Sequence, residues 1–179
     1  MAQGYVLFIS EEKLKQSTAI QGNVDVEYLL PYIQVAQDKY LSPKLGGKLY
    51  DYISDLIAND TIGDAANVAY KTLVDDYIGE MLVHFAFFEC IPFLRYKIQN
   101  GNIYAKTSET GQALSRTEAQ DLREEVRNTA EFYQNRLIEF LCCESSSYPL
   151  YGQSQTCGQP KVDKNAFYNG INLERPSNC

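Results

Sequence analysis

The stretch Asn23–Ile53, NVDVEYLLPYIQVAQDKYLSPKLGGKLYDYI, contains two amphipathic helical patterns with a break between them. Apolar residues recur every three or four positions, which is the spacing of one helix face. Asp25 can cap the first helix by accepting free N–H groups of its first turn. Ser42 precedes Pro43, and proline suits the first position of a new helix. The stretch therefore predicts two helices, Val26–Tyr40 and Pro43–Ile57.

Proline and glycine interrupt both patterns. Pro31 lies inside the first one, so that helix either kinks there or begins there. Gly46 and Gly47 each cost the second helix about 1 kcal/mol relative to alanine. Two successive glycines indicate a close approach of another backbone or a broken helix. Helix packing explains them better than a phosphate-binding loop, because no apolar strand precedes Gly46-Gly47-Lys48.

Two longer helices follow. The pattern Ala65–Ile98 is apolar on nearly every side in its second half, which is typical of a central buried helix. We expect this second half, Met81–Leu94, to be too short and interrupted to span a bilayer, and Pro92 to bend or end the helix. Ser115 and Glu118 form a capping box for the helix Thr117–Cys142. The expected contacts between these helices join Leu122, Val126, Tyr133 and Leu137 to Val74, Ile78, Met81 and Phe85.

Together the patterns predict an all-α fold, a small helical bundle of about four helices with an extended C-terminal arm. The predicted parts are an N-terminal arm (1–22), a helical domain (23–143) and an extended C-terminal tail (144–179). Strands are expected only within residues 1–10 or 101–114.

The tail lacks the apolar density to fold alone. Its apolar residues are spaced singly, which suits an arm laid on another surface. The candidate interface residues are Tyr148, Leu150, Tyr151, Phe167, Tyr168 and Ile171. The alternative is that the tail folds back on its own helical core.

Composition narrows the class of protein. The net charge is −7, and a surface that grips nucleic acid needs concentrated Lys and Arg. Five cysteines without a Cys-x-x-Cys pair favour reduced thiols over disulfides or zinc. No signal peptide is visible at the N-terminus. Fourteen tyrosines and no tryptophan suit half-buried surfaces such as subunit interfaces.

No catalytic, cofactor-binding or metal site is predicted. His84 is the only histidine, and Glu80 and Asp76 share its helix face. Di-metal bundles use Glu-x-x-His on two helices, so we expect His84 to be buried and bonded to Glu80 or to backbone. A lone histidine in a core helix is badly placed to activate a nucleophile, so we do not expect an enzyme.

Four pieces of the chain resemble head–tail connector (adaptor) proteins of tailed bacteriophages. They are Leu7-Phe8-Ile9-Ser10-Glu11-Glu12-x-Leu14-Lys15 with Thr18–Asp25, Tyr32-Ile33-x-x-Ala36-Gln37-Asp38 with Leu45-Gly46 and Leu49-Tyr50, Ala130-Glu131-x-Tyr133, and Tyr148-Pro149-Leu150-Tyr151. The resemblance covers roughly residues 7–151 and is to connectors of crAss-like and other Bacteroides phages. Pro31 and the cysteine-containing tail do not match that pattern.

The resemblance implies a structural virion protein of the neck, assembled in the host cytoplasm. Such proteins form a ring, usually dodecameric, that lies below the portal, extends the DNA channel and joins the capsid to the tail. The implied partners are further copies of the chain, the portal protein and other tail or connector proteins. DNA would pass without specific binding, and no membrane is involved. From the acidic balance we expect a channel that repels DNA, lined by Asp and Glu from helix starts or the 101–114 loop.

A different class of function stays open. The apolar region around Phe85 and Phe88 could form the pocket of a small-molecule-binding or regulatory helical domain.

Overall fold

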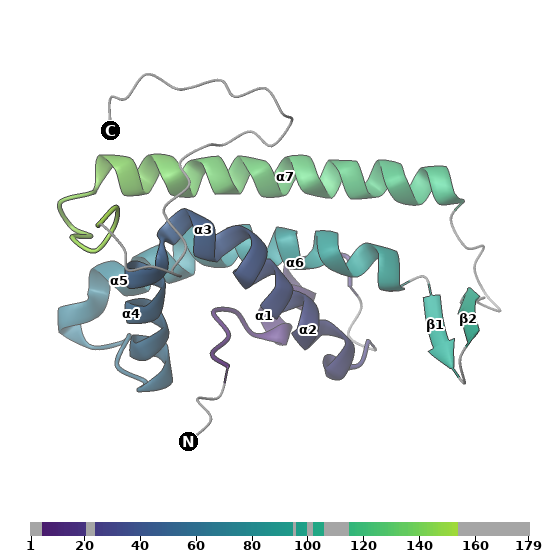
Figure 1. The fold of residues 1–179 in the computed structure, drawn as a ribbon, viewed down its shortest axis with the longest axis horizontal. Helices are drawn as coiled ribbons and strands as arrows, with labels where there is room; N and C mark the ends of the chain where they lie inside the picture. Colours follow the sequence, from purple (N-terminus) through teal and green to yellow (C-terminus); the bar gives the residue numbers. More distant parts are fainter. Residues whose placement is uncertain (1–4, 21–23, 95, 100–101, 106–114, 154–179) are drawn as a thin grey trace.

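The computed structural model describes residues 5–20, 24–94, 96–99, 102–105 and 115–153. These residues form an all-α fold with one short hairpin (Figure 1). The α-helices are α1 (Glu11–Gln16), α2 (Val26–Ala36), α3 (Ser42–Leu45), α4 (Gly47–Ala58), α5 (Val68–Thr72), α6 (Gly79–Leu94) and α7 (Arg116–Cys143). Between them lie two π-helical turns, η1 (Gln37–Leu41) and η3 (Leu73–Ile78), and the 3-10 turn η2 (Ala65–Asn67). Strands β1 (Tyr96–Gln99) and β2 (Asn102–Ala105) pair antiparallel.

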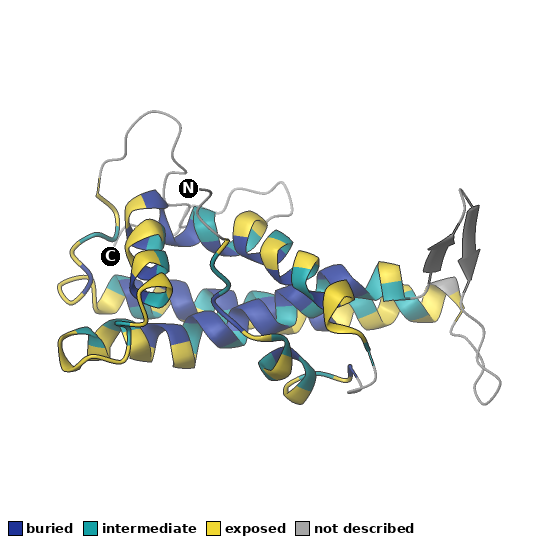
Figure 2. Cartoon of the chain, turned by 90° about the horizontal axis from the view of Figure 1, so that it is seen from below, coloured by how far each residue is buried: buried dark blue, intermediate teal, exposed yellow. Residues whose placement is uncertain are grey.

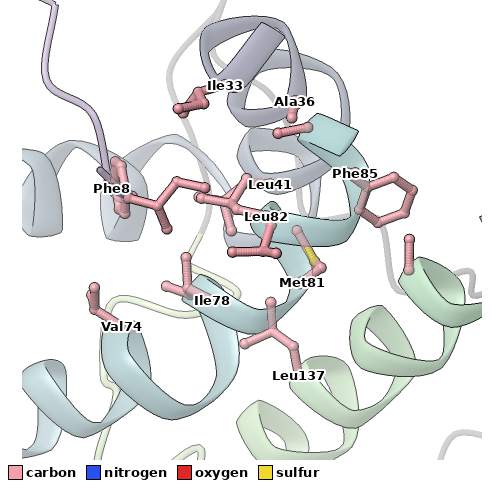
Figure 3. Packing of buried hydrophobic residues seen from close by; sticks show 14 of the residues in the cluster. Phe8, Ile33, Ala36, Leu41, Val74, Ile78, Met81, Leu82, Phe85 and Leu137 are labelled. Carbon is pink, nitrogen blue, oxygen red and sulfur yellow. The ribbon is translucent and has the colours of Figure 1, made fainter. Parts of the chain in front are cut away.

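Helix α6 is the centre of the fold, with α7 packed on one side and α2 on the other (Figure 1). Met81, Leu82 and Phe85 are almost completely buried, as the all-round apolar pattern predicts. Figure 2 shows buried residues where the helices meet and exposed residues along their outer faces. Side chains of the N-terminal segment, α2, η3, α6 and α7 meet in one cluster (Figure 3). Phe8 belongs to this cluster, so the predicted N-terminal arm shares the core of the helical domain.

The break in the Asn23–Ile53 stretch falls at Gly46 rather than at Ser42-Pro43. The helix that begins at Val26 includes Pro31 and continues through η1 and α3 to Leu45. In η1 the Ser42 N–H donates to the Gln37 carbonyl five residues back, and this altered register accommodates Pro43, which lacks an N–H. Gly46 has φ 77° and ψ 153°, a backbone conformation that other residues rarely adopt.

The first two α-helices differ in how they are capped. Ser10 caps α1, because its hydroxyl accepts the Lys13 N–H at 3.1 Å. Asp25 precedes α2 but makes no side-chain capping bond, so the prediction for Asp25 was wrong. The free N–H groups of that first turn have Glu27 nearby, whose charge suits the helix dipole.

The predicted helix Ala65–Ile98 is shorter than expected. It ends at Leu94, two residues after Pro92, and β1 takes up the next residues. The prediction of strands only within 1–10 or 101–114 was therefore wrong for β1. Ile98 lies opposite Ile103, so pairing with β2 satisfies backbone groups that a fraying helix end would expose. Residues 5–10 form no strand.

The longer run Ala65–Leu94, which includes Met81–Leu94, is long and apolar enough to cross a membrane by length and composition. Of its most apolar window, 56% is buried inside the protein. The core helix of a globular protein meets the same length and composition criteria, and here the apolar side chains pack on α2 and α7.

The capping box at the start of α7 is confirmed. The Ser115 hydroxyl accepts the Glu118 N–H at 3.2 Å, and the Glu118 carboxylate accepts the Ser115 N–H at 2.7 Å. Val126 and Leu137 are buried against the core as expected, and Tyr133 is half-buried. Leu122 is 41% exposed, so its predicted contact with the core was wrong.

Truncation of Phe85 to alanine should lower the free energy of unfolding by about 3–5 kcal/mol. Phe85 is 3% exposed and stacks on Tyr40 with ring centroids 3.9 Å apart, so its removal leaves a cavity. Urea denaturation followed by circular dichroism measures the change. Phe132→Ala is the matched control, because that ring is 63% exposed and should cost little. Equal effects of the two substitutions would contradict the assignment of the core.

Candidate functional site

Gln37 is a completely buried polar residue at the start of η1. Its Oε1 accepts the backbone N–H of Phe8 at 2.9 Å, and its Nε2 donates to the Val6 carbonyl at 3.0 Å and to the Tyr50 hydroxyl at 3.2 Å. The side-chain amide thus pairs with the N-terminal segment as a neighbouring strand would. Tyr5 adds a hydrogen bond from its hydroxyl to Asp38 at 2.7 Å, and both burial and this bond raise the pKa of Tyr5. The N-terminal segment is therefore fixed to η1 and α4.

Glu89 is 8% exposed and forms a second polar contact of the same turn. Its carboxylate accepts hydrogen bonds from Lys39 Nζ at 2.8 Å and from the Tyr40 hydroxyl at 2.7 Å. Burial raises the pKa of Glu89, but these two bonds and the positive charge of Lys39 and Arg123 outweigh it, so the pKa is lowered. The π-helical turn directs Gln37 and Asp38 toward the N-terminal segment and Lys39 and Tyr40 toward Glu89 of α6.

The other π-helical turn also receives a side chain from elsewhere. Lys13 Nζ, on α1, donates to the Asp75 carbonyl of η3 at 3.2 Å and lies 3.5 Å from a Glu80 carboxylate oxygen. Gly79 leaves the space for it, since a Cβ at that position would collide with Lys13 Nζ. A π-helical turn shifts the hydrogen-bond register, which makes a backbone carbonyl accessible to an outside donor.

His84 is half-buried and stacks on Tyr133 of α7, with ring centroids 5.0 Å apart and planes 7° from parallel. Burial lowers its pKa, although the charge of Glu80 opposes the shift. We predicted a bond from His84 to Glu80 or to backbone, whereas the contact that the structure gives is this ring stack. His84, Glu125 and Thr129 line a small groove of about 250 Å³ beside the turn after α1. Within the described residues, no group of three or more His, Cys, Asp and Glu is placed to hold a metal ion.

The region proposed as a small-molecule pocket is covered by the chain itself. Phe85 stacks on Tyr40, and the Arg123 guanidinium lies 4.1 Å from the centre of the Phe88 ring. Cys90 is completely buried nearby as a free thiol, and burial raises its pKa to about 12. The stack on Phe85 and the guanidinium over Phe88 occupy ring faces that a ligand would need to contact.

The candidate interface residues of the tail fall into two groups. Tyr148 is 1% exposed and donates its hydroxyl to the Ala69 carbonyl at 2.9 Å, while Leu150 and Tyr151 pack partly against the same core. The assignment of Tyr148 to a partner is thus corrected, because the apolar face of α5 and α7 already buries its ring. Phe167, Tyr168 and Ile171 lie outside the described residues, as do residues 106–114 of the predicted channel loop.

Two groups of exposed apolar side chains lie on different layers of the subunit. The α2 patch consists of Tyr28, which is 57% exposed, and Phe93 at the end of α6, which is 53% exposed and stacks on half-buried Tyr32 of α2. The α7 patch is centred on Phe132, which is 63% exposed, and Leu122, which is 41% exposed, lies ten residues earlier on the same helix. On a helix of 100° per residue, Phe132 points away from the buried stripe of α7 and hence away from α6. Exposed apolar patches of this kind often mark interaction sites.

Replacement of Gln37 by leucine should release the N-terminal segment. The substitution leaves the Phe8 N–H and the Val6 carbonyl without their buried partner, which costs about 1–3 kcal/mol for each unsatisfied group. Amide hydrogen exchange at Phe8 should speed up, and urea denaturation should show the loss of stability. Gln34→Leu is the control, because Gln34 is exposed on the adjoining α2. Unchanged protection of the Phe8 amide would contradict this role of Gln37.

Glu89→Gln should lower stability by about 1–2 kcal/mol at neutral pH, a modest value because the Lys39 side chain is 56% exposed. Since the folded-state pKa of Glu89 lies below the unfolded value, its contribution is present above the ordinary glutamate pKa and is lost as pH falls through the lowered pKa. The difference between wild type and Glu89→Gln should therefore shrink in acid. Thermal melts from neutral to acidic pH measure it, with Glu124→Gln on the exposed face of α7 as control. A constant difference across that range would contradict the assignment.

Comparison with known proteins gives one result. No curated protein and no solved structure matches the chain. The model of a protein family matches residues 41–161, from the end of η1 through α7 to the beginning of the tail. This span is more than half of the chain, so the protein belongs to DUF6712, a family of unknown function.

Proposed function

We propose that this chain is a structural protein of a bacteriophage virion, a head–tail connector. In the proposal its copies form a ring below the portal, extend the DNA channel and join the capsid to the tail. The four sequence pieces that resemble phage connectors suggest the family of assemblies. The structural observation that carries the proposal is that one subunit exposes two unlike groups of apolar side chains, the α2 patch and the α7 patch, on different layers of the bundle.

Unlike patches favour a head-to-tail assembly. The α2 patch and the α7 patch differ in composition, and α2 and α7 pack on α6 from different sides (Figure 1). A contact between the α2 patch of one copy and the α7 patch of the next leaves one patch open at each end. Repetition of that contact yields a closed ring when the rotation between copies matches. A self-complementary dimer would instead use the same patch twice.

The resemblance also has a physical counterpart in the subunit. Three of its sequence-distant residues, Phe8, Gln37 and Tyr50, contact one another through hydrogen bonds and through rings 5.1 Å apart. Tyr148, from the last matching piece, is buried in the same core. The matching residues are thus those that fix the fold of the subunit, which supports a shared architecture.

The net charge of −7 suits a channel through which DNA slides. Phosphates held by Lys and Arg would resist translocation, whereas carboxylates in the bore repel them. We propose that Asp and Glu at helix starts line the bore. A ring whose bore is dominated by Lys and Arg would contradict this part of the proposal.

Mass photometry of the protein, alone and with the portal of the phage that encodes it, tests the assembly. We expect a large ring with portal and its loss in the variants Phe132→Ser and Tyr28→Ser, each with wild-type helical circular dichroism. Val68→Ser is the control, because Val68 is 56% exposed on α5 and belongs to neither patch.

A mixture of the two variants identifies the kind of contact. Each retains one intact patch, so head-to-tail association predicts a dimer in the mixture and only monomers in each variant alone. A dimer formed by Tyr28→Ser alone would instead indicate an α7–α7 contact. A wild-type protein that stays monomeric with portal would contradict the connector function.

A further inference from the structure

A groove of about 620 Å³ lies between the N-terminal segment and α4. Tyr5 and Val6 form one wall, and side chains from successive turns of α4 form the other. The charged residues of its lining are Asp51 and Asp55, one helical turn apart, so the groove is acidic. The Gln37 hydrogen bonds hold its N-terminal wall in place.

The described part of the tail ends beside this groove. Tyr148 is anchored in the core, and the Gln153 side chain accepts a hydrogen bond from Lys48 Nζ at 3.1 Å. Lys48 lies on α4, three residues before Asp51. Gln153, the last described residue, is therefore held at the end of α4 that leads into the acidic groove, and 26 residues, 154–179, follow it in the sequence.

The tail contains a short segment whose charge complements that groove. In Pro160-Lys161-Val162-Asp163-Lys164, two lysines are three residues apart behind a proline. Proline and the residue before it favour extended or polyproline II backbone. Polyproline II repeats every three residues with a rise of about 3.1 Å, so both lysines share one face roughly 9 Å apart and Asp163 lies on another. Lysine side chains are long and flexible enough to meet carboxylates about 6 Å apart along a helix.

We propose that the groove between the N-terminal segment and α4 binds the segment Pro160–Lys164 of the same chain, with Lys161 and Lys164 against Asp51 and Asp55. Eight residues from Gln153 to Lys161 span up to roughly 25 Å when extended, which is ample for a groove that begins one helical turn away. Binding within one chain has a high effective concentration, so individually weak surface ion pairs suffice.

This docking goes beyond the connector function and does not depend on it. In a ring, this docking would determine where the rest of the tail leaves each subunit. Phe167, Tyr168 and Ile171 follow Lys164 by only a few residues, so they would leave the subunit from the far end of the α4 groove. They would then be available to a neighbouring copy or to the portal.

Trypsin digestion of the full chain tests the docking directly, because trypsin cleaves after free lysines. With intact-mass detection at low salt, cleavage after Lys161 and Lys164 should be about fivefold slower than in a free peptide of residues 154–179, the factor that about 1 kcal/mol of binding gives. The double variant Asp51→Asn and Asp55→Asn should restore the peptide rate. Asp76→Asn is the control, since Asp76 is exposed on η3 outside the groove and should leave the rate slow.

Three results would overturn the proposal. Cleavage of the wild-type chain at the peptide rate would show that the lysines are not docked. Slow cleavage that persists in the Asp51→Asn and Asp55→Asn variant would place the segment elsewhere. Slow cleavage that disappears on dilution would show that the segment comes from a second copy. Ring formation is measured separately by mass photometry, so failure of one proposal leaves the other standing.

Discussion

The side-chain amide of Gln37 replaces a strand partner that the N-terminal segment does not have. A buried backbone N–H or carbonyl without a partner is costly, so a segment laid against a helical core needs a donor and an acceptor from elsewhere. Gln37 supplies both to Phe8 and Val6 and also contacts Tyr50 of α4. Phe8 can then contribute its ring to the core, and one wall of the acidic groove is held in place.

The two π-helical turns have related effects on the fold. The turn η1 joins α2 to α3, the turn η3 directly precedes α6, and each receives or directs polar contacts between distant elements. In η1, Lys39 donates a hydrogen bond to the Glu89 carboxylate. In η3, the Asp75 carbonyl accepts a hydrogen bond from Lys13, whose side chain passes Gly79. Such turns shift side chains relative to an uninterrupted helix, which lets a mainly apolar bundle contain specific polar contacts.

Much of the bundle could be predicted from the sequence because its signals are local. The Ser115–Glu118 capping box, the apolar run of α6 and the stripe on α7 all depend on residues within a few turns of one another. Spacing also puts Gln37 on the inner helix face. The spacing could not reveal that the hydrogen-bond partner of Gln37 is the Phe8 backbone, 29 positions away. The register shifts of η1 and η3 escape periodicity too, since they displace the pattern by a single residue.

The candidate site was less predictable than the fold. Tyr148 shows why: a lone aromatic residue between turn residues has the same pattern whether its pocket lies in its own subunit or in a neighbour. The pocket here is built by α5 and α7, and Ala69 supplies the carbonyl for the tyrosine hydroxyl. An exposed surface such as the α2 patch depends likewise on which side chains remain uncovered after packing.

The reactivity of the buried Cys90 thiol reports on opening of the helical core. Its thiol is fully buried next to Glu89 in the central helix, and burial holds its pKa at about 12. The thiolate is the reactive species, so alkylating reagents and oxidants reach this sulfur only when α6 separates from its neighbours. Exposed Cys143 at the end of α7 reacts without that opening. The ratio of the two alkylation rates therefore measures how often the bundle opens under native conditions.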